Sequence, residues 1–256
     1  AHRPQTGRRF LSKIIVITGA GDRLGRALAR RFAADGESVV LLGRTRTKVE
    51  AVAAEIGERA MAVECDVASP DSVRGAFATI AARHPRIDVL ISSAAVYEPI
   101  PIAEASDEQI LGAIGTNLTG PILCARAAIP LMGRGSHIIN VSSESVEMRF
   151  PFFVLYQGSK AGLERFSEGL HHELDPSGIK VTTVRAGQMF EEGRMPGCWD
   201  PGMRMRFGKA AMAAGLNMAE LPKSQYRSVT DVFRAIIDLP ADLQTPVVTI
   251  HARASD

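Results

Sequence analysis

The sequence has 256 residues, of which 46% are hydrophobic and 23% are charged, a composition that suits one folded domain over residues 1–256 and argues against a disordered chain. The formal net charge is only +2 at pH 7 and no basic block is longer than Arg8-Arg9, so we expect small-molecule partners and neither nucleic acid nor membrane. No apolar run approaches the roughly 18 residues of a membrane span, and residues 1–10 are polar. We therefore expect a cytoplasmic protein, with reduced thiols because its three cysteines form no Cys-x-x-Cys pair.

Short apolar runs alternate with longer helical segments along most of the chain. The predicted strands are Lys13–Thr18, Ser38–Leu42, Ala60–Glu64, Val89–Ser92, His137–Val141, Lys180–Val184 and Val247–His251. The predicted helices are Leu24–Ala34, Thr47–Ile56, Pro70–Ala82, Asp107–Met132, Val154–Asp175 and Thr230–Leu239. This alternation is typical of βαβ units. It predicts a Rossmann-like, doubly wound α/β domain with a seven-stranded parallel sheet and helices on both faces.

One segment, approximately residues 188–228, breaks the alternation around a predicted helix at Met203–Ala214. A long insertion of this kind is usually a lid or a substrate-binding loop. The apolar side chains of this segment suit an adaptable substrate pocket. A contact with the protein core or with another subunit explains them equally well. These side chains are Met189, Phe190, Met195, Trp199, Met203, Met205, Phe207, Met212 and Met218. Arg194, Arg204 and Arg206 are candidates to contact an anionic substrate, and surface charges are the simpler interpretation.

A glycine-rich loop, Thr18-Gly19-Ala20-Gly21-Asp22-Arg23-Leu24-Gly25, joins the first predicted strand to the first helix. Glycines in this position let the backbone approach a pyrophosphate, and the helix that follows supplies unpaired N–H groups. We therefore expect a nucleotide at Gly19, Gly21, Arg23, Leu24 and Gly25. The alternative interpretation is an ordinary tight turn.

The end of the second strand bears on the choice of cofactor. Enzymes specific for NAD place a carboxylate there, on the ribose 2′-hydroxyl, but this chain has Gly43-Arg44. The guanidinium of Arg44 suits a 2′-phosphate, with Arg23 and Arg46 as helpers, so NADP(H) is the predicted cofactor. The alternative is that these arginines are solvated surface charges.

Asp66 follows the third strand and is a candidate to accept a hydrogen bond from the adenine amino group. A turn cap is an equally good explanation of this aspartate. We also expect Val67, next to it, Ala94, after the fourth strand, and Gly187, after the sixth, to line the cofactor site.

Tyr156 and Lys160 are four residues apart in a predicted helix, and therefore lie on one face of it. The pKa of a free phenol is near ~10, and a nearby ammonium lowers it, so Lys160 is expected to tune Tyr156 as an acid–base and to hold the cofactor ribose. Such a pair also occurs by chance on ordinary helices.

Two polar residues strengthen this interpretation. Ser143 is predicted just beyond the fifth strand, where it can donate a hydrogen bond to a substrate carbonyl oxygen; Ser142 is the structural alternative, since Ser-Ser is also common turn chemistry. Asn117, a poor helix former between Gly115 and Gly120, is a candidate to tie a water chain to Lys160, or simply to mark a helix kink.

In this order, residues 18–25, Asp66, Asn117, Ser143, Tyr156 and Lys160 resemble the motifs of the short-chain dehydrogenase/reductase family, from Lys13 to about His251. The resemblance implies catalytic roles for Asn117, Ser143, Tyr156 and Lys160. The chain departs from the family pattern where Arg23 replaces a loop glycine, where Ser92-Ser93-Ala94-Ala95 replaces Asn-Asn-Ala-Gly, and where Ala186-Gly187 replaces Pro-Gly. The arginine is similar to that of pteridine reductases, but Ser143 stands where those enzymes typically have Asp.

The predicted activity is therefore an NADP(H)-dependent interconversion of a ketone or aldehyde with an alcohol, on a largely apolar substrate. A non-catalytic NADP(H)-binding sensor and an isomerase or epimerase with tightly held nicotinamide remain alternatives. None of the six histidines has metal-ligand spacing, so no metal is expected. The family resemblance implies a homodimer or homotetramer through the helices at Asp107–Met132 and Val154–Asp175.

Overall fold

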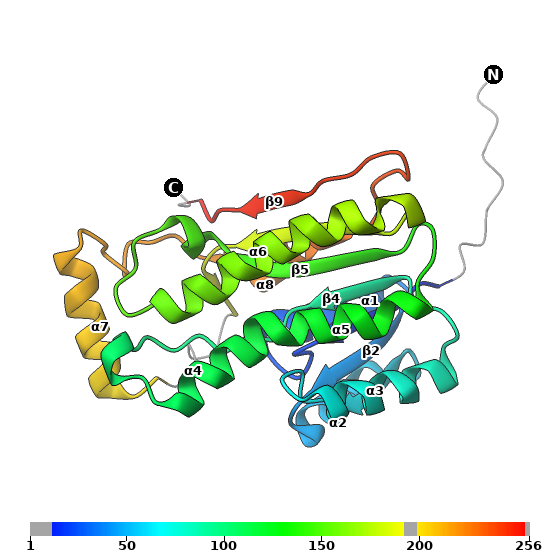
Figure 1. Ribbon diagram of the computed structural model, residues 1–256, viewed down its shortest axis with the longest axis horizontal. Coiled ribbons are helices and arrows are strands. Elements are labelled where there is room, and N and C mark those ends of the chain that lie inside the picture. The colour runs from blue at the N-terminus through cyan, green and yellow to red at the C-terminus, as the bar shows by residue number, and fades with distance from the viewer. Residues whose placement is uncertain (1–11, 192–198, 254–256) are drawn as a thin grey trace.

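The computed structural model describes residues 12–191 and 199–253. Seven strands form one sheet with parallel pairing throughout; Figure 1 draws the sheet with its surrounding helices. Their spatial order is β3 (Ala60–Glu64), β2 (Ser38–Gly43), β1 (Ile14–Thr18), β4 (Val89–Ser92), β5 (His137–Ser143), β6 (Lys180–Ala186) and β9 (Val247–Ile250). The predicted fold class is confirmed. Because β5 and β6 each continue two residues further than predicted, Ser143 is the last residue of β5 rather than the residue beyond it.

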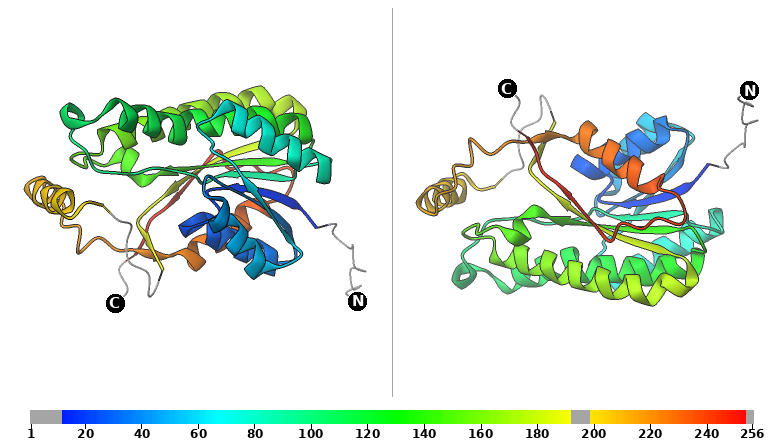
Figure 2. Two further views of the ribbon diagram at one scale, coloured as in Figure 1. Left: turned by 90° about the horizontal axis from the view of Figure 1, so that it is seen from below. Right: turned by 90° about the horizontal axis from the view of Figure 1, so that it is seen from above.

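Helices cover both faces of this sheet (Figure 2). One face carries α1 (Arg23–Ala34), α2 (Arg46–Ile56) and α8 (Tyr226–Ile237), and the other carries α3 (Pro70–Arg83), α4 (Asp107–Ile114), α5 (Gly120–Ala128) and α6 (Val154–Leu174). Successive side chains of a strand point to opposite faces. Accordingly, Ile15 and Ile17 enter the hydrophobic cluster under α1 and α8, whereas Val16 enters the cluster under α3, α5 and α6. Strands buried on both faces explain the continuous apolar runs in the sequence.

The helical segment predicted over Asp107–Met132 is helical from Asp107 to Leu131, but it is not one regular α-helix. The segment is divided into α4, a π-helical stretch at Gly115–Thr119, α5 and a 3₁₀ turn at Ile129–Leu131. Pro121 has no N–H to donate to a helical hydrogen bond, and the side chain of Asn117 is bonded outside the helix. These two features accompany the break in the regular hydrogen-bond pattern.

The predicted insertion holds more structure than one helix. Helix α7 (Pro201–Ala213) is flanked by two short strands, β7 (Met189–Phe190) and β8 (Ser224–Gln225), which pair with each other. Helix α8 begins at Tyr226, four residues before the predicted start. Arg194 and Met195 fall outside the described residues. Figure 1 shows α7 at the end of the molecule toward which the β9 arrow points.

Within the described part of the chain, no helix is both long and apolar enough to cross a membrane. The same residues include no group of three or more His, Cys, Asp or Glu side chains arranged to hold a metal ion. That no metal is bound stays a prediction.

Candidate active site

The carboxyl edge of the sheet brings Ser143 and Tyr156 together. Ser143 ends β5 and is 9% exposed, and its Oγ accepts a 3.1 Å hydrogen bond from the backbone N–H of Ser145. Tyr156 lies in the first turn of α6, close enough to Ser143 for the serine hydroxyl to lower the pKa of its phenol. The hydroxyls of Ser143 and Tyr156 therefore lie near each other, although a 3₁₀ turn separates the two residues along the chain.

Ser142 has a different partner. Its hydroxyl donates a 2.7 Å hydrogen bond to Oε1 of Glu164 on α6, and the same carboxylate accepts from Nε and Nη2 of Arg185 on β6. Ser142 therefore belongs to a polar network that ties α6 to the sheet. The hydroxyl next to the candidate acid–base is that of Ser143.

Burial dominates the ionisation of Tyr156. Desolvation raises the pKa of its phenol to about 12, and the nearby hydroxyl of Ser143 offsets this only partly. Lys160 is not among the groups that shift this pKa, so its expected tuning of Tyr156 stays a prediction. The ammonium lies 5.9 Å from the centre of the Tyr156 ring and is engaged elsewhere.

Lys160 is almost completely buried, with 2% of its surface exposed. Its Nζ donates a 2.7 Å hydrogen bond to the carbonyl oxygen of Val141. Burial lowers the pKa of this ammonium to about 8, because a charged group loses the hydration of bulk water. The lysine therefore changes charge close to physiological pH.

Asn117 fastens the loop after β4 to α6. Its Oδ1 accepts from the Val96 N–H at 2.9 Å, and its Nδ2 donates to the Val96 carbonyl oxygen at 2.8 Å and to Ser159 Oγ at 3.1 Å. Ser159 in turn donates a 2.7 Å hydrogen bond to the carbonyl oxygen of Tyr156. The side-chain amide of Asn117 is thus bonded within the protein, and its predicted water chain to Lys160 stays a prediction.

The glycine-rich loop is packed too closely for larger residues. Gly19 has φ +69°, a value that favours glycine, and a Cβ there would lie 2.9 Å from the Cα of Ala94. A Cβ on Gly25 would lie 2.3 Å from the carbonyl oxygen of Gly19. Helix α1 begins at this loop, where the Asp22 carboxylate caps the N–H of Arg23, and the other N–H groups of its first turn suit a phosphate. The arrangement fits a dinucleotide.

The remaining loop residues lie in different environments. Arg23 has φ +47°, its N–H donates to Asp22 Oδ1 at 2.7 Å, and its guanidinium stacks 4.8 Å from the centre of the Tyr97 ring. Leu24 is 5% exposed and packs in the core. Leu24 can therefore contact a ligand through its backbone but not through its side chain.

Strand β2 ends at Gly43, and the next residue, Arg44, lies beside the site. A Cβ on Gly43 would lie 2.7 Å from Val49 Cγ1, which explains a glycine there. Arg44 and Tyr156 both line one hollow of about 170 Å³ between α4 and the start of α6. Arg46, the predicted helper, instead forms an exposed ion pair with Glu50 at 2.8 Å.

Asp66, Val67 and Gly187 have identifiable structural contacts. Asp66 Oδ1 accepts a 3.0 Å hydrogen bond from the Ala68 N–H, which is the turn-cap geometry. Val67 is 6% exposed and packs where a Cβ on Gly120 would sit. The N–H of Gly187 donates to the Ile250 carbonyl oxygen at 3.0 Å. Their cofactor roles stay predictions.

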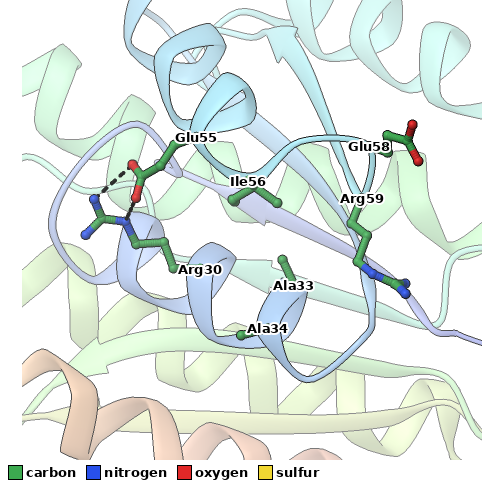
Figure 3. A pocket seen from close by; sticks show the side chains of 7 residues that line it. All are labelled: Arg30, Ala33, Ala34, Glu55, Ile56, Glu58 and Arg59. Carbon is green, nitrogen blue, oxygen red and sulfur yellow. Dashed lines mark hydrogen bonds and ion pairs between the residues drawn. The ribbon is translucent and has the colours of Figure 1, made fainter.

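A larger hollow, of about 520 Å³, lies at the opposite edge of the sheet (Figure 3). It is bridged by an ion pair between Arg30 Nε and Glu55 Oε1 at 2.6 Å. Ala34 ends α1 just before β2, and Arg59 precedes β3, so this hollow adjoins the amino ends of the strands. None of the predicted site residues lines it.

The sequence argument missed several residues that shape the site. Gln157 donates to the carbonyl oxygens of Ser145 and Met148, and so holds the 3₁₀ turn after Ser143 against α6. Tyr97 lies between the phosphate loop and Tyr156. Gln157 and Ser159 lie between Tyr156 and Lys160 in the sequence, so the motif itself could have pointed to them as site residues. No feature of the sequence around Tyr97 marks that residue as part of the site.

The comparisons with known proteins agree with this geometry. The short chain dehydrogenase family model matches residues 13–194. An uncharacterized oxidoreductase of Methylorubrum extorquens is 34% identical over 185 residues, covering 71% of this chain and 75% of that protein. A serine 3-dehydrogenase of Agrobacterium fabrum is 32% identical over 182 residues, covering 69% and 72%.

Among solved structures, an alcohol dehydrogenase from the archaeon Thermococcus sibiricus, complexed with 5-hydroxy-NADP, has the same fold. Its TM-score is 0.79 at 20% sequence identity, and the match covers 96% of this chain and 100% of that one. The family match over residues 13–194 and the relative that is 34% identical establish the family. The chain belongs to the short-chain dehydrogenase family of oxidoreductases.

Proposed function

We propose that the protein is an NADP(H)-dependent oxidoreductase that interconverts a ketone or aldehyde with the corresponding alcohol, with Tyr156 as the general acid and base. The observation that carries the proposal is the placement of Ser143, at the carboxyl end of β5, beside Tyr156, in the first turn of α6 and one helical turn from buried Lys160. Two hydroxyls that meet in this way are suited to hold one carbonyl oxygen.

In the direction of reduction, the carbonyl oxygen accepts hydrogen bonds from Ser143 and Tyr156. NADPH, when bound, supplies the hydride that reaches the carbonyl carbon. Tyr156 gives its proton to the oxygen, and the product is a neutral alcohol. The raised pKa of Tyr156 keeps the phenol protonated at neutral pH, which is the form that reduction needs. Orientation and stabilisation of the developing oxyanion are the protein's contribution.

Lys160, the phosphate loop and Arg44 are proposed to hold the cofactor. The ammonium of Lys160 is fixed by the Val141 carbonyl oxygen and keeps further donors for the ribose hydroxyls. Gly19, Gly21, Arg23, Leu24 and Gly25 are proposed to surround the pyrophosphate, Arg44 the 2′-phosphate. The preference for NADP(H) rests on Gly43-Arg44 after β2, because the fold accepts either nicotinamide cofactor.

Residues 1–256 are proposed to form one domain that acts as a homodimer or homotetramer. Leu111 on α4 and Val154 on α6 are apolar side chains that are 72% and 56% exposed on the helices expected at the interface. Large apolar side chains in such positions suit a protein contact.

The first test is fluorescence titration of the protein with NADPH and NADH, followed by a carbonyl panel with the wild type and Tyr156→Phe. We expect NADPH to bind more tightly than NADH. We also expect Tyr156→Phe to bind NADPH normally but to lose roughly 10²–10⁴-fold in kcat, the usual contribution of general acid catalysis. Near-normal turnover by Tyr156→Phe would remove the proposed acid, and binding of neither cofactor would remove the function.

A further inference from the structure

We propose that the substrate site selects carbonyl compounds that carry a flat aromatic ring, and that Tyr97 and Trp199 set this selectivity. The inference rests on the proposed function, because it takes Tyr156 as the group that holds the carbonyl oxygen. Three side chains, Tyr97, Phe153 and Trp199, form what we call the aromatic wall beside Tyr156. The wall is the feature that the ring of the substrate would meet.

The rings of the wall surround Tyr156 in edge-to-face contacts. The ring centres of Tyr97 and Phe153 lie 6.3 Å and 5.8 Å from that of Tyr156, with interplanar angles of 62° and 86°. Trp199 lies 6.1 Å from Tyr97 and 5.8 Å from Phe153. Edge-to-face pairs are the geometry in which aromatic rings attract one another beyond simple burial.

The rings of Tyr97 and Trp199 are partly exposed, whereas the ring of Phe153 is buried. Phe153 is 8% exposed and packs on Phe207 of α7, which is 4% exposed, with ring centres 5.3 Å apart. Tyr97 and Trp199 are only partly buried. The indole Nε1 of Trp199 donates a 3.0 Å hydrogen bond to the Tyr97 carbonyl oxygen. The two accessible rings are therefore held in place before any substrate binds, which lowers the entropy cost of binding.

The charged groups near the wall are already engaged with protein. The Arg23 guanidinium stacks on the Tyr97 ring at 4.8 Å, and Arg206 of α7 pairs with both oxygens of Glu104 at 2.8 Å and 2.6 Å. Arg206, a sequence-predicted candidate for an anionic substrate, is thus neutralised by a carboxylate. Because Arg206 is paired with Glu104, the aromatic wall suits a neutral aromatic compound better than a carboxylate.

A matched pair of ketones separates aromatic recognition from simple hydrophobicity. Benzylacetone and its cyclohexyl analogue have the same carbonyl, and two methylene groups insulate that carbonyl from the ring in both. Each aromatic pair is worth about 0.5–1.5 kcal/mol beyond burial, which is roughly two- to twelvefold. We expect wild-type kcat/KM with NADPH to favour benzylacetone by about fivefold or more.

The variants test which rings are responsible. Tyr97→Leu and Trp199→Leu are each expected to lower the preference for benzylacetone by roughly two- to tenfold, since each removes one ring contact. Tyr97→Phe keeps the ring and is expected to keep the preference. Phe190→Leu is the matched control, because Phe190 lies on β7 and is no part of the wall.

A second measurement does not depend on turnover. Trp199 is the only tryptophan in the chain, so its fluorescence reports on the wall directly. We expect benzylacetone, added to the NADP⁺-bound protein, to change this emission at lower concentration than the cyclohexyl analogue, and Tyr97→Leu to remove the difference. The fluorescence measurement needs only the wild type and Tyr97→Leu. It therefore tests the proposal even if the Trp199→Leu variant fails to fold.

The outcomes distinguish the two proposals. Equal kcat/KM for the two ketones, or a preference that survives in Tyr97→Leu, would overturn the aromatic selectivity while leaving the reductase function intact. No NADPH oxidation with either ketone or with the wider carbonyl panel would overturn the proposed function and this inference with it.

Discussion

The ammonium of Lys160 donates a 2.7 Å hydrogen bond to the carbonyl oxygen of Val141, in a position where only 2% of the lysine is exposed. This contact places a cation against the end of β5, two residues before Ser143. Burial lowers the pKa of Lys160 to about 8, so the ammonium is present below that pH and is lost above it. The function of the site should follow this titration.

We therefore expect kcat/KM for carbonyl reduction to fall as the pH rises through about 8, by up to tenfold per pH unit. Lys160→Arg keeps the positive charge to much higher pH, and should move this fall beyond pH 10. The measurement is the pH profile of both proteins, with folding checked by thermal melts. A profile that is the same for the arginine variant would assign the titration to another group.

The neighbouring serines should respond differently to alanine. Ser143→Ala removes the hydroxyl beside Tyr156, and we expect kcat to fall roughly 10²–10³-fold, as for a lost oxyanion donor. Ser142→Ala breaks only the bond to Glu164, so it should leave kcat within about threefold and lower the free energy of unfolding by about 1 kcal/mol. Steady-state kinetics and urea unfolding of both variants check this. A large kcat loss in Ser142→Ala would reverse the assignment.

Arg44 and Arg46 form a second matched pair. Arg44 lines the hollow with Tyr156, whereas Arg46 pairs with Glu50 on the exposed face of α2. Arg44→Ala should weaken NADPH binding by roughly 10–100-fold, the cost of lost charge-assisted hydrogen bonds, and leave NADH binding unchanged. Arg46→Ala should change neither dissociation constant by more than about twofold. If both variants lose NADPH affinity equally, the two arginines act as a general positive surface.

Acid should destabilise the fold through His137. This residue is 4% exposed, its Nε2 lies 2.8 Å from Thr182 Oγ1, and burial lowers its pKa from 6.5 to about 4. Between these values the unfolded chain binds a proton that the folded protein does not, so stability is complete above pH 6.5 and falls as the pH drops toward 4. The loss between pH 7 and pH 5 should be about 2 kcal/mol.

The measurement is urea unfolding at pH 7 and pH 5. His137→Gln cannot take up this proton and should lose less stability over the same interval, by about 2 kcal/mol. His84→Gln is the control, since His84 is less buried and its pKa is lowered less far. Equal pH dependence in the wild type and His137→Gln would exclude His137 as the cause.

Much of the fold followed from local patterns. All seven main strands were predicted, because each is a short apolar run that must be buried on both faces of a parallel sheet. The π-helical stretch around Asn117 could not be predicted with certainty, since the backbone groups that the Asn117 side chain bonds belong to Val96, about twenty residues earlier in the sequence. A local pattern carries no information about such a partner.

Some features of the candidate site could likewise be predicted from the sequence, and others could not. Ser143, Tyr156, Lys160 and the glycine-rich loop were identified from residue type and spacing, because helical and strand periodicity determine which residues share a face. Local patterns in the sequence were therefore enough to predict the fold class, the family and the candidate site residues. The raised pKa of Tyr156, the bond from Ser142 to Glu164 and the contact of Tyr97 with Trp199 beside Tyr156 arise only in the folded chain. Desolvation and ring contacts depend on groups far apart in the chain, and packing alone brings those groups together.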